Sequence, residues 1–252
     1  MSADEPLAVA VEQPQGTSEF LLACDHASSR IPRSLGTLGL SDRELSSHVA
    51  WDIGTAGVAR LLAERLDATL VMQNYSRLVI DCNRPLASAE SIPSRSEWVQ
   101  IAANEHLAPA EVAARTAEIF TPYHEELRTI LDRRLRDRRP TVLVSVHSFT
   151  PTYRGVSRPW HIGLMYRHDA RLGAALLKLL RRDERLQVGD NEPYAIADDS
   201  DYTIPTHGES RHIAHVGLEI RQDLIADEAG QKTWAGRLAS LLKQAAGMLG
   251  EA

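Results

Sequence analysis

Short apolar runs alternate with longer stretches of helical periodicity along this chain, and this alternation restricts its fold more than any other feature. The apolar runs that predict strands are residues 20–26, 68–73, 77–82, 141–147, 161–166 and 215–222. Helical patterns cover residues 41–66, 108–137 and 169–183, and most of the chain after residue 222. Strands separated by helices favour an α/β fold: three αβα layers around a mixed, mainly parallel sheet.

Composition predicts a single folded unit. The chain has 252 residues, of which 43% are hydrophobic and 25% charged, as expected for a globular protein. No linker rich in Gly, Ser or Pro divides it, so we predict one domain over residues 18–252. Residues 1–17 are acidic and interrupted by proline, and we expect them to be flexible.

Several functional classes are disfavoured by charge and hydropathy. A net charge of −6 and a pI near 5.9 argue against nucleic acid as a partner. The sequence shows no signal-peptide pattern, and no apolar run approaches the ~20 residues that cross a membrane. Cys24 and Cys82 lie in apolar runs and are expected to be reduced thiols. We therefore expect a cytoplasmic protein without membrane or nucleic-acid partners.

Two of the predicted strands end in histidine. His26 closes the run 20–26, and His147 closes the run 141–147. Sites in α/β folds form at the carboxyl ends of strands. Two imidazoles placed there suit an open zinc site, which also accepts a carboxylate. The sequence therefore predicts a single Zn²⁺ ion held by His26 and His147.

The third metal ligand is not fixed by spacing, since no HExxH motif occurs. Asp52 is our choice, because small residues follow it and leave room for a site. The competing interpretation makes Asp52 the N-cap of the helix that follows. His48 and Asp81 are the reserve candidates, and His48 could share a helix face with Asp52.

Basic side chains flank the apolar run within "YSRLVIDCNRP" at residues 75–85. Arg77 precedes the run, and Asn83 and Arg84 follow it directly. Arginines grip planar carboxylates bidentately, so this segment predicts binding of a carboxylate substrate. The alternative is a pair of surface arginines bound to acids.

Glu219 interrupts the otherwise apolar run 215–222. A buried carboxylate must be paired, bind a metal or carry a raised pKa. We expect Glu219 to act as general base, and simple pairing with Arg221 on the same strand face is the alternative. Ser148, His161 and Arg221 are further candidates for substrate contacts. No G-x-S-x-G elbow, P-loop or dinucleotide motif is present.

Taken together, several motifs resemble the N-formylglutamate amidohydrolase family. They are "DHASSRIP", "WDIGT", "YSRLVIDCNRP", "VSVHSFTP", "RPWHIG", "DNEPY" and "LEIRQDL". The resemblance runs from about residue 18 to residue 245. The family is similar to zinc carboxypeptidases and aspartoacylase-type deacylases. The resemblance implies a three-layer αβα fold with one zinc ion at strand ends.

By position, the resemblance implies that His26 and His147 are zinc ligands and that Glu219 is the base. It also implies that Asn83 and Arg84 grip a substrate carboxylate, while Arg77 polarises the scissile carbonyl or binds a carboxylate. The wider superfamily has glutamate three residues after the first histidine, where this chain has Ser29. Asp52 therefore substitutes as the acid ligand.

The resulting hypothesis is a zinc-dependent hydrolase of an N-acyl amino acid, such as a formylglutamate-like acidic substrate. One alternative is a carboxypeptidase-like enzyme cutting another acidic or cell-wall-derived substrate. Others are a non-catalytic carboxylate-binding or metal-storage protein and a metal-free serine hydrolase.

Overall fold

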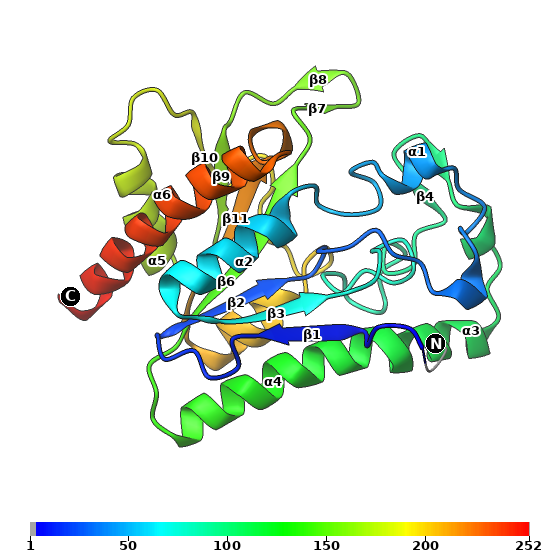
Figure 1. Cartoon of the computed structure of the whole chain (residues 1–252), viewed down its shortest axis with the longest axis horizontal. Helices are drawn as coiled ribbons and strands as arrows, with labels where there is room; N and C mark the ends of the chain where they lie inside the picture. Colours follow the sequence, from blue (N-terminus) through cyan, green and yellow to red (C-terminus); the bar gives the residue numbers. More distant parts are fainter. Residues whose placement is uncertain (1–3, 252) are drawn as a thin grey trace.

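A seven-stranded sheet forms the centre of the computed structural model, which describes residues 4–251 (Figure 1). The strand order is β1-β3-β2-β6-β11-β9-β10. The strands are β1 (Val9–Glu12), β2 (Phe20–Cys24), β3 (Thr69–Gln73), β6 (Val142–Phe149), β9 (Ile162–Met165), β10 (Val188–Asp190) and β11 (Ala214–Arg221).

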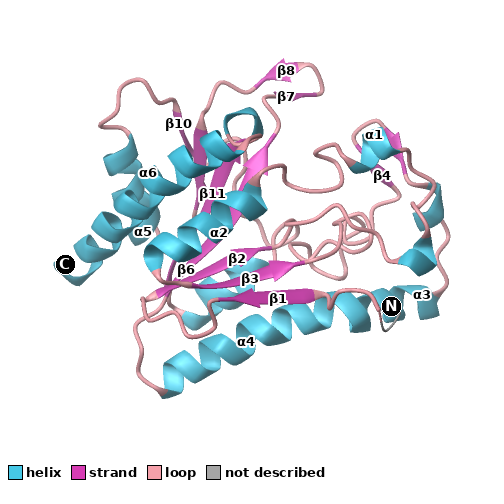
Figure 2. Ribbon diagram, viewed as in Figure 1, coloured by secondary structure: helices cyan, strands magenta, loops and turns pink. Residues whose placement is uncertain are grey.

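The central strands β3, β2, β6 and β11 are parallel. β1 pairs antiparallel with β3, and β9 pairs antiparallel with β11, so the sheet is mixed. All residues of β2, β3 and β6 are buried, as expected for strands covered on both faces. Their carboxyl ends meet at one edge, where Figure 2 shows loops gathered beyond β2 and β3.

Helices cover both faces of the sheet. One face carries α2 (Thr55–Leu66), α5 (Arg171–Leu180) and α6 (Glu228–Gly247), which pack on one another and on the strands. The other carries α4 (Thr121–Arg136), which lies along β1 and β3 (Figure 1) and continues from α3 (Pro109–Arg115) through a π turn. The predicted three-layer αβα fold with a mainly parallel sheet is confirmed.

Helical spacing of apolar residues explains why α2 packs as it does. Val58, Ala59, Leu62, Ala63 and Leu66 recur at intervals of three and four and are all buried. They form one hydrophobic core with β2, β6, α5 and α6. A second core lies on the opposite face, beneath α4.

Two small hairpins stand apart from the main sheet. β4 (Arg95–Ser96) pairs with β5 (Val99–Gln100), and β7 (Thr152–Tyr153) pairs with β8 (Val156–Ser157). A four-residue helix, α1 (Asp42–Leu45), has Ser41 as its N-cap, with a complete capping box. In the region that the structure describes, we find no helix that is both long and apolar enough to span a bilayer.

Three predictions of local structure were wrong. The predicted strand 77–82 forms turns instead, because its backbone bonds partly with the adjacent Ser76 and partly with residues elsewhere in the fold, not with a strand ladder. The predicted helix 41–66 is interrupted at residues 46–54, so His48 and Asp52 share no helix face. Residues 9–12, expected to be flexible, form β1 in the sheet, while residues 1–3 lie outside the described part.

Candidate metal centre and active site

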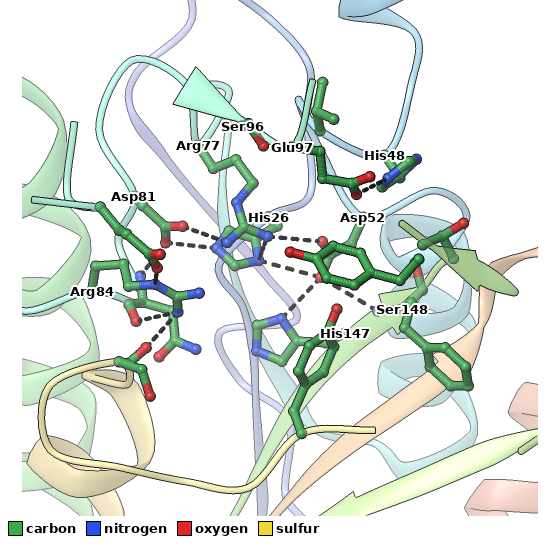
Figure 3. Close-up of a pocket in the computed structure, with 18 of the residues that line it drawn as sticks. His26, His48, Asp52, Arg77, Asp81, Arg84, Ser96, Glu97, His147 and Ser148 are labelled. Atoms are coloured by element: carbon green, nitrogen blue, oxygen red, sulfur yellow. Dashed lines mark hydrogen bonds and ion pairs between the residues drawn. The ribbon is translucent and has the colours of Figure 1, made fainter. Parts of the chain in front are cut away.

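Three segments that are remote in sequence bring His26, Asp52 and His147 together (Figure 3). His26 follows β2, His147 lies in β6, and Asp52 lies in the loop before α2. One ligand atom from each of these buried residues lies within 4.8 Å of the other two. The two histidines therefore meet beside a carboxylate, as the sequence predicted.

The donor set fits a divalent cation such as zinc. Asp52 Oδ2 lies 3.3 Å from His26 Nδ1 and 2.9 Å from His147 Nδ1. Tetrahedral ligands at 2.0–2.1 Å from zinc are separated by roughly 3.3 Å, so these separations are compatible with one shared ion. Asp52 is not the N-cap of α2, since Gly54 occupies that position.

The remaining ring nitrogen of each histidine faces a carboxylate. His26 Nε2 lies 2.7 Å from Asp81 Oδ1, and His147 Nε2 lies 3.2 Å from Asp25 Oδ2. Ser145 Oγ also contacts His147 Nε2, at 2.8 Å. Such carboxylate partners orient metal-binding imidazoles. Asp25 directly precedes His26 in the sequence, yet its carboxylate contacts the other histidine, His147.

The histidines and carboxylates of this centre shift one another's pKa values. Burial would lower the pKa of His147, but Asp25 and Asp52 hold it well above the usual value. Burial would likewise raise the pKa of Asp52, but the two histidines hold it below its usual range. The carboxylates thus favour positive charge between them. A bound cation would supply this charge in place of the imidazole protons, because histidine binds a metal only in its neutral form.

Arg77 forms ion pairs with two acids of this site. Its Nη2 donates to Asp81 Oδ2 at 2.6 Å, and its Nη1 lies 3.5 Å from Asp52 Oδ1. The guanidinium therefore connects one carboxylate of the metal cluster with the carboxylate that orients His26. Arg77 also lines the cavity. Its catalytic role stays a prediction.

Glu219 lies next to the metal cluster, paired in register with His147 across β11 and β6. Its side chain is buried, and Oε2 has no hydrogen-bond partner within the described part of the chain. Burial raises the pKa of Glu219 to about 7, and His147 opposes that rise. The alternative pairing with Arg221 is wrong, since Arg221 binds Asp223.

Asn83 and Arg84 contact the segment 200–203. The side-chain Oδ1 of Asn83 accepts from the backbone N–H groups of Tyr202 and Thr203, and Arg84 donates to the carbonyl of Ser200. Arg84 Nε also donates to the carboxylate of Glu90 at 3.1 Å. Both predicted residues line the cavity, and their binding of substrate stays a prediction.

Of the remaining residues predicted to contact substrate, one lines the cavity and two do not. Ser148 lines the cavity, but its hydroxyl donates to the carbonyl of Ile53. Its backbone N–H donates to Asp52 Oδ2 at 3.3 Å. His161 and Arg221 do not line the cavity: His161 accepts from the backbone of Gln187, and Arg221 points to Asp223.

A cavity of about 450 Å³ opens over the metal cluster. Its lining includes residues that sequence reasoning did not single out: Arg95, Glu97, Tyr153 and Arg154 from the two hairpins, and Asp201. The hairpin residues carried no motif or strand-end position that would have signalled them. Tertiary packing alone brings these short segments to the mouth of the site.

Comparisons with known proteins agree with this geometry. The family model described as N-formylglutamate amidohydrolase matches residues 18–226. A crystal structure of an Agrobacterium tumefaciens gene product is 42% identical, with a TM-score of 0.94, covering 97% of this chain and 96% of that one. No match was found among curated proteins.

A second solved structure is the N-formylglutamate amidohydrolase from Ralstonia eutropha JMP134. It is 18% identical, with a TM-score of 0.73, over 98% of this chain and 100% of that one. At this identity the likeness shows a shared fold. The family match, which spans most of the chain, shows that this protein belongs to the N-formylglutamate amidohydrolase family.

Proposed function

We propose that this protein is a metal-dependent hydrolase that cleaves the amide bond of an N-acyl amino acid with an acidic side chain. One observation carries the proposal: buried Glu219, whose Oε2 has no hydrogen-bond partner among residues 4–251, lines the same cavity as the cluster of His26, Asp52 and His147. A cluster of this type with an adjacent carboxylate is suited to activating water.

The hydrolysis adds one water molecule across the C–N bond. The acyl carbon gains the water oxygen and leaves as a carboxylate, and the nitrogen leaves as an amine. A divalent ion held by His26, Asp52 and His147 would supply Lewis-acid polarisation of the carbonyl and acidify a water molecule.

Glu219 takes the proton from the attacking water and returns it to the leaving nitrogen. A pKa of about 7 makes its carboxylate a stronger base than an exposed glutamate, while still allowing proton return. Arg77 supplies positive charge beside Asp52 and stabilises the oxyanion that develops on the carbonyl.

Besides Arg77, three arginines line the cavity and are available to bind substrate carboxylates. Arg84 is held by Glu90, whose side chain is 71% exposed. Such an exposed pair contributes at most about 1 kcal/mol, so a substrate carboxylate can replace Glu90. Arg95 and Arg154, on the two hairpins, have no carboxylate partner within the region described and favour an anionic ligand at the mouth.

The experiment is metal quantification on the purified protein, followed by a panel of N-formyl, N-acetyl and N-succinyl glutamate and aspartate with and without chelator. We expect about one zinc equivalent per chain and turnover that chelation removes and zinc restores. A protein that hydrolyses these substrates equally well after complete metal removal would refute the proposal.

Replacing Glu219 with Gln separates metal binding from catalysis. We expect the E219Q protein to retain zinc, because Glu219 is not one of the three clustered ligands. Its kcat should fall by about 10²–10⁴-fold, since the amide cannot accept the proton. Zinc content and kcat are measured on the same preparation, and wild-type turnover by E219Q would remove Glu219 from the mechanism.

A further inference from the structure

The turn of the β4–β5 hairpin inverts the usual placement of polar and apolar side chains. Trp98 is 64% exposed, whereas the side chain of the adjacent Glu97 is only 6% exposed and lines the cavity. Glutamate is almost never buried without a partner, and tryptophan is usually well covered. The hairpin therefore directs a carboxylate into the cavity and leaves the indole outside.

Only one oxygen of this carboxylate is satisfied. Glu97 Oε1 lies 2.5 Å from His48 Nε2, and the His48 ring meets Trp98 edge-on with centroids 5.9 Å apart. Glu97 Oε2 is buried and has no hydrogen-bond partner among the described residues. An unpaired buried acceptor destabilises a folded protein, so a donor from a bound molecule is the natural complement.

The cavity has two chemically different ends around the metal cluster. In Figure 3, Arg84 and Asp81 lie on one side of His26, and Glu97 and His48 lie on the other, towards Asp52. All of these residues line the same cavity. A substrate held at Arg84 by its carboxylate, with its amide at the metal cluster, extends its acyl group towards Glu97.

We infer that the acyl group of the substrate carries a hydrogen-bond donor, best an ammonium group, that binds Glu97 Oε2. This inference rests on the proposed amide hydrolysis and narrows its substrate class to N-aminoacyl acidic amino acids. A formyl or acetyl group has no such donor and leaves the Glu97 oxygen unpaired. A charged hydrogen bond at a buried carboxylate favours the aminoacyl substrate by roughly 10–100-fold.

The test uses pairs of substrates that match in size and differ only in the donor. N-glycyl-glutamate is compared with N-propionyl-glutamate, and N-β-alanyl-glutamate with N-butanoyl-glutamate, on the zinc-loaded full chain. We expect kcat/KM to be at least about 10-fold higher for the amino member of one pair or both. In the Glu97→Gln variant, the ratio of kcat/KM between the amino member and the acyl member of each pair should fall to near one.

Glutamine at position 97 keeps an acceptor for His48, so the hairpin contact survives while the charge is lost. Glu105→Gln is the matched control, because Glu105 binds Gln100 of the same hairpin but is exposed and does not line the cavity. The control should leave the ratio unchanged. If Glu97→Gln lowers kcat/KM equally for both members of each pair, Glu97 is merely structural and the inference is wrong.

Binding measured without turnover keeps the two proposals apart. Calorimetric titration of the Glu219→Gln protein with N-glycyl-glutamate should give a dissociation constant at least about 10-fold lower than for N-propionyl-glutamate. Adding Glu97→Gln should remove this difference. Cleavage of all the acyl glutamates without preference refutes the inference and leaves the proposed hydrolysis intact, whereas cleavage of none refutes the proposed hydrolysis.

Discussion

At the scale of residues, each histidine of the metal cluster is held through both of its ring nitrogens. Nδ1 faces Asp52 in both cases, and Nε2 faces Asp81 for His26 and Asp25 for His147. The outer carboxylates fix the rings in the orientation that binding requires, so the site needs little rearrangement to accept an ion.

Replacing Asp81 with Asn should therefore weaken metal binding without removing a ligand. We expect the zinc dissociation constant to rise by about 10–100-fold. An amide has no negative charge to make the His26 imidazole a stronger ligand, and it orients the ring less well than the carboxylate does. Competition with a chromogenic chelator measures the constant. Asp198→Asn, an exposed acid bound to Arg167, is the control, and equal affinity in D81N and D198N would contradict the role of Asp81.

At the scale of elements, the sequence predicted the buried strands well and the irregular segments badly. The runs ending at His26 and His147 and the run containing Glu219 became β2, β6 and β11, because continuous apolar character is typical of central strands. Residues 77–82 are equally apolar, yet they form buried turns whose partners lie elsewhere in the fold. Hydropathy reports burial and does not distinguish these two outcomes.

Local pattern also failed at residues 46–54, where amphipathic spacing continued through a loop. Gly54 ends this loop with φ +83° as the N-cap of α2, and an added Cβ would lie 2.2 Å from the carbonyl oxygen of Ile225. Gly54 thus lies close to Ile225, in the segment before α6, and this contact fixes the position of the loop that carries Asp52. Such contacts are tertiary, so no single-sequence pattern contains them.

Gly54→Ala should accordingly be costly. We expect a loss of about 2–4 kcal/mol in the free energy of unfolding, from the left-handed conformation together with the clash against Ile225. Gly39→Ala is matched in backbone conformation, at φ +81°, but meets nothing within 4 Å, so it should cost only about 1–2 kcal/mol. Denaturant unfolding compares them, and equal losses would show that the contact is unimportant.

At the scale of the whole molecule, the core beneath the active site contains neutral histidines. His124 Nε2 donates to the carbonyl of Cys82 at 2.8 Å, and its Nδ1 lies 3.0 Å from His207 Nε2. Burial lowers the pKa of His124 to about 4, and burial with the neighbouring His124 lowers that of His207 to about 3. Protonation of either buried ring therefore destabilises the fold.

This pair predicts how stability depends on pH. Since the folded pKa values lie below the unfolded value near 6.5, the unfolded chain binds more protons as pH falls from about 6.5 to about 4. Each histidine should cost roughly 3 kcal/mol of stability over this window, so the pair should cost roughly 5–6 kcal/mol. The double variant His124→Gln/His207→Gln should show a shallower fall in unfolding free energy, measured by denaturant titration at each pH.

The exposed His168 supplies the control for this experiment, because its ring is outside the core. His168→Gln should reproduce the pH dependence of the wild type. An unchanged slope in the double variant would assign the acid sensitivity to other groups.

The two hairpins at the cavity mouth, residues 95–100 and 152–157, share no strand with the seven-stranded sheet. In the proposed enzyme, the metal ligands and the base therefore lie inside the packed layers, whereas the substrate contacts that the hairpins offer lie at the periphery. Substitutions or grafts in these hairpins can retune which molecules the scaffold accepts while leaving the machinery that breaks the bond in place, which makes them the place to begin redesign.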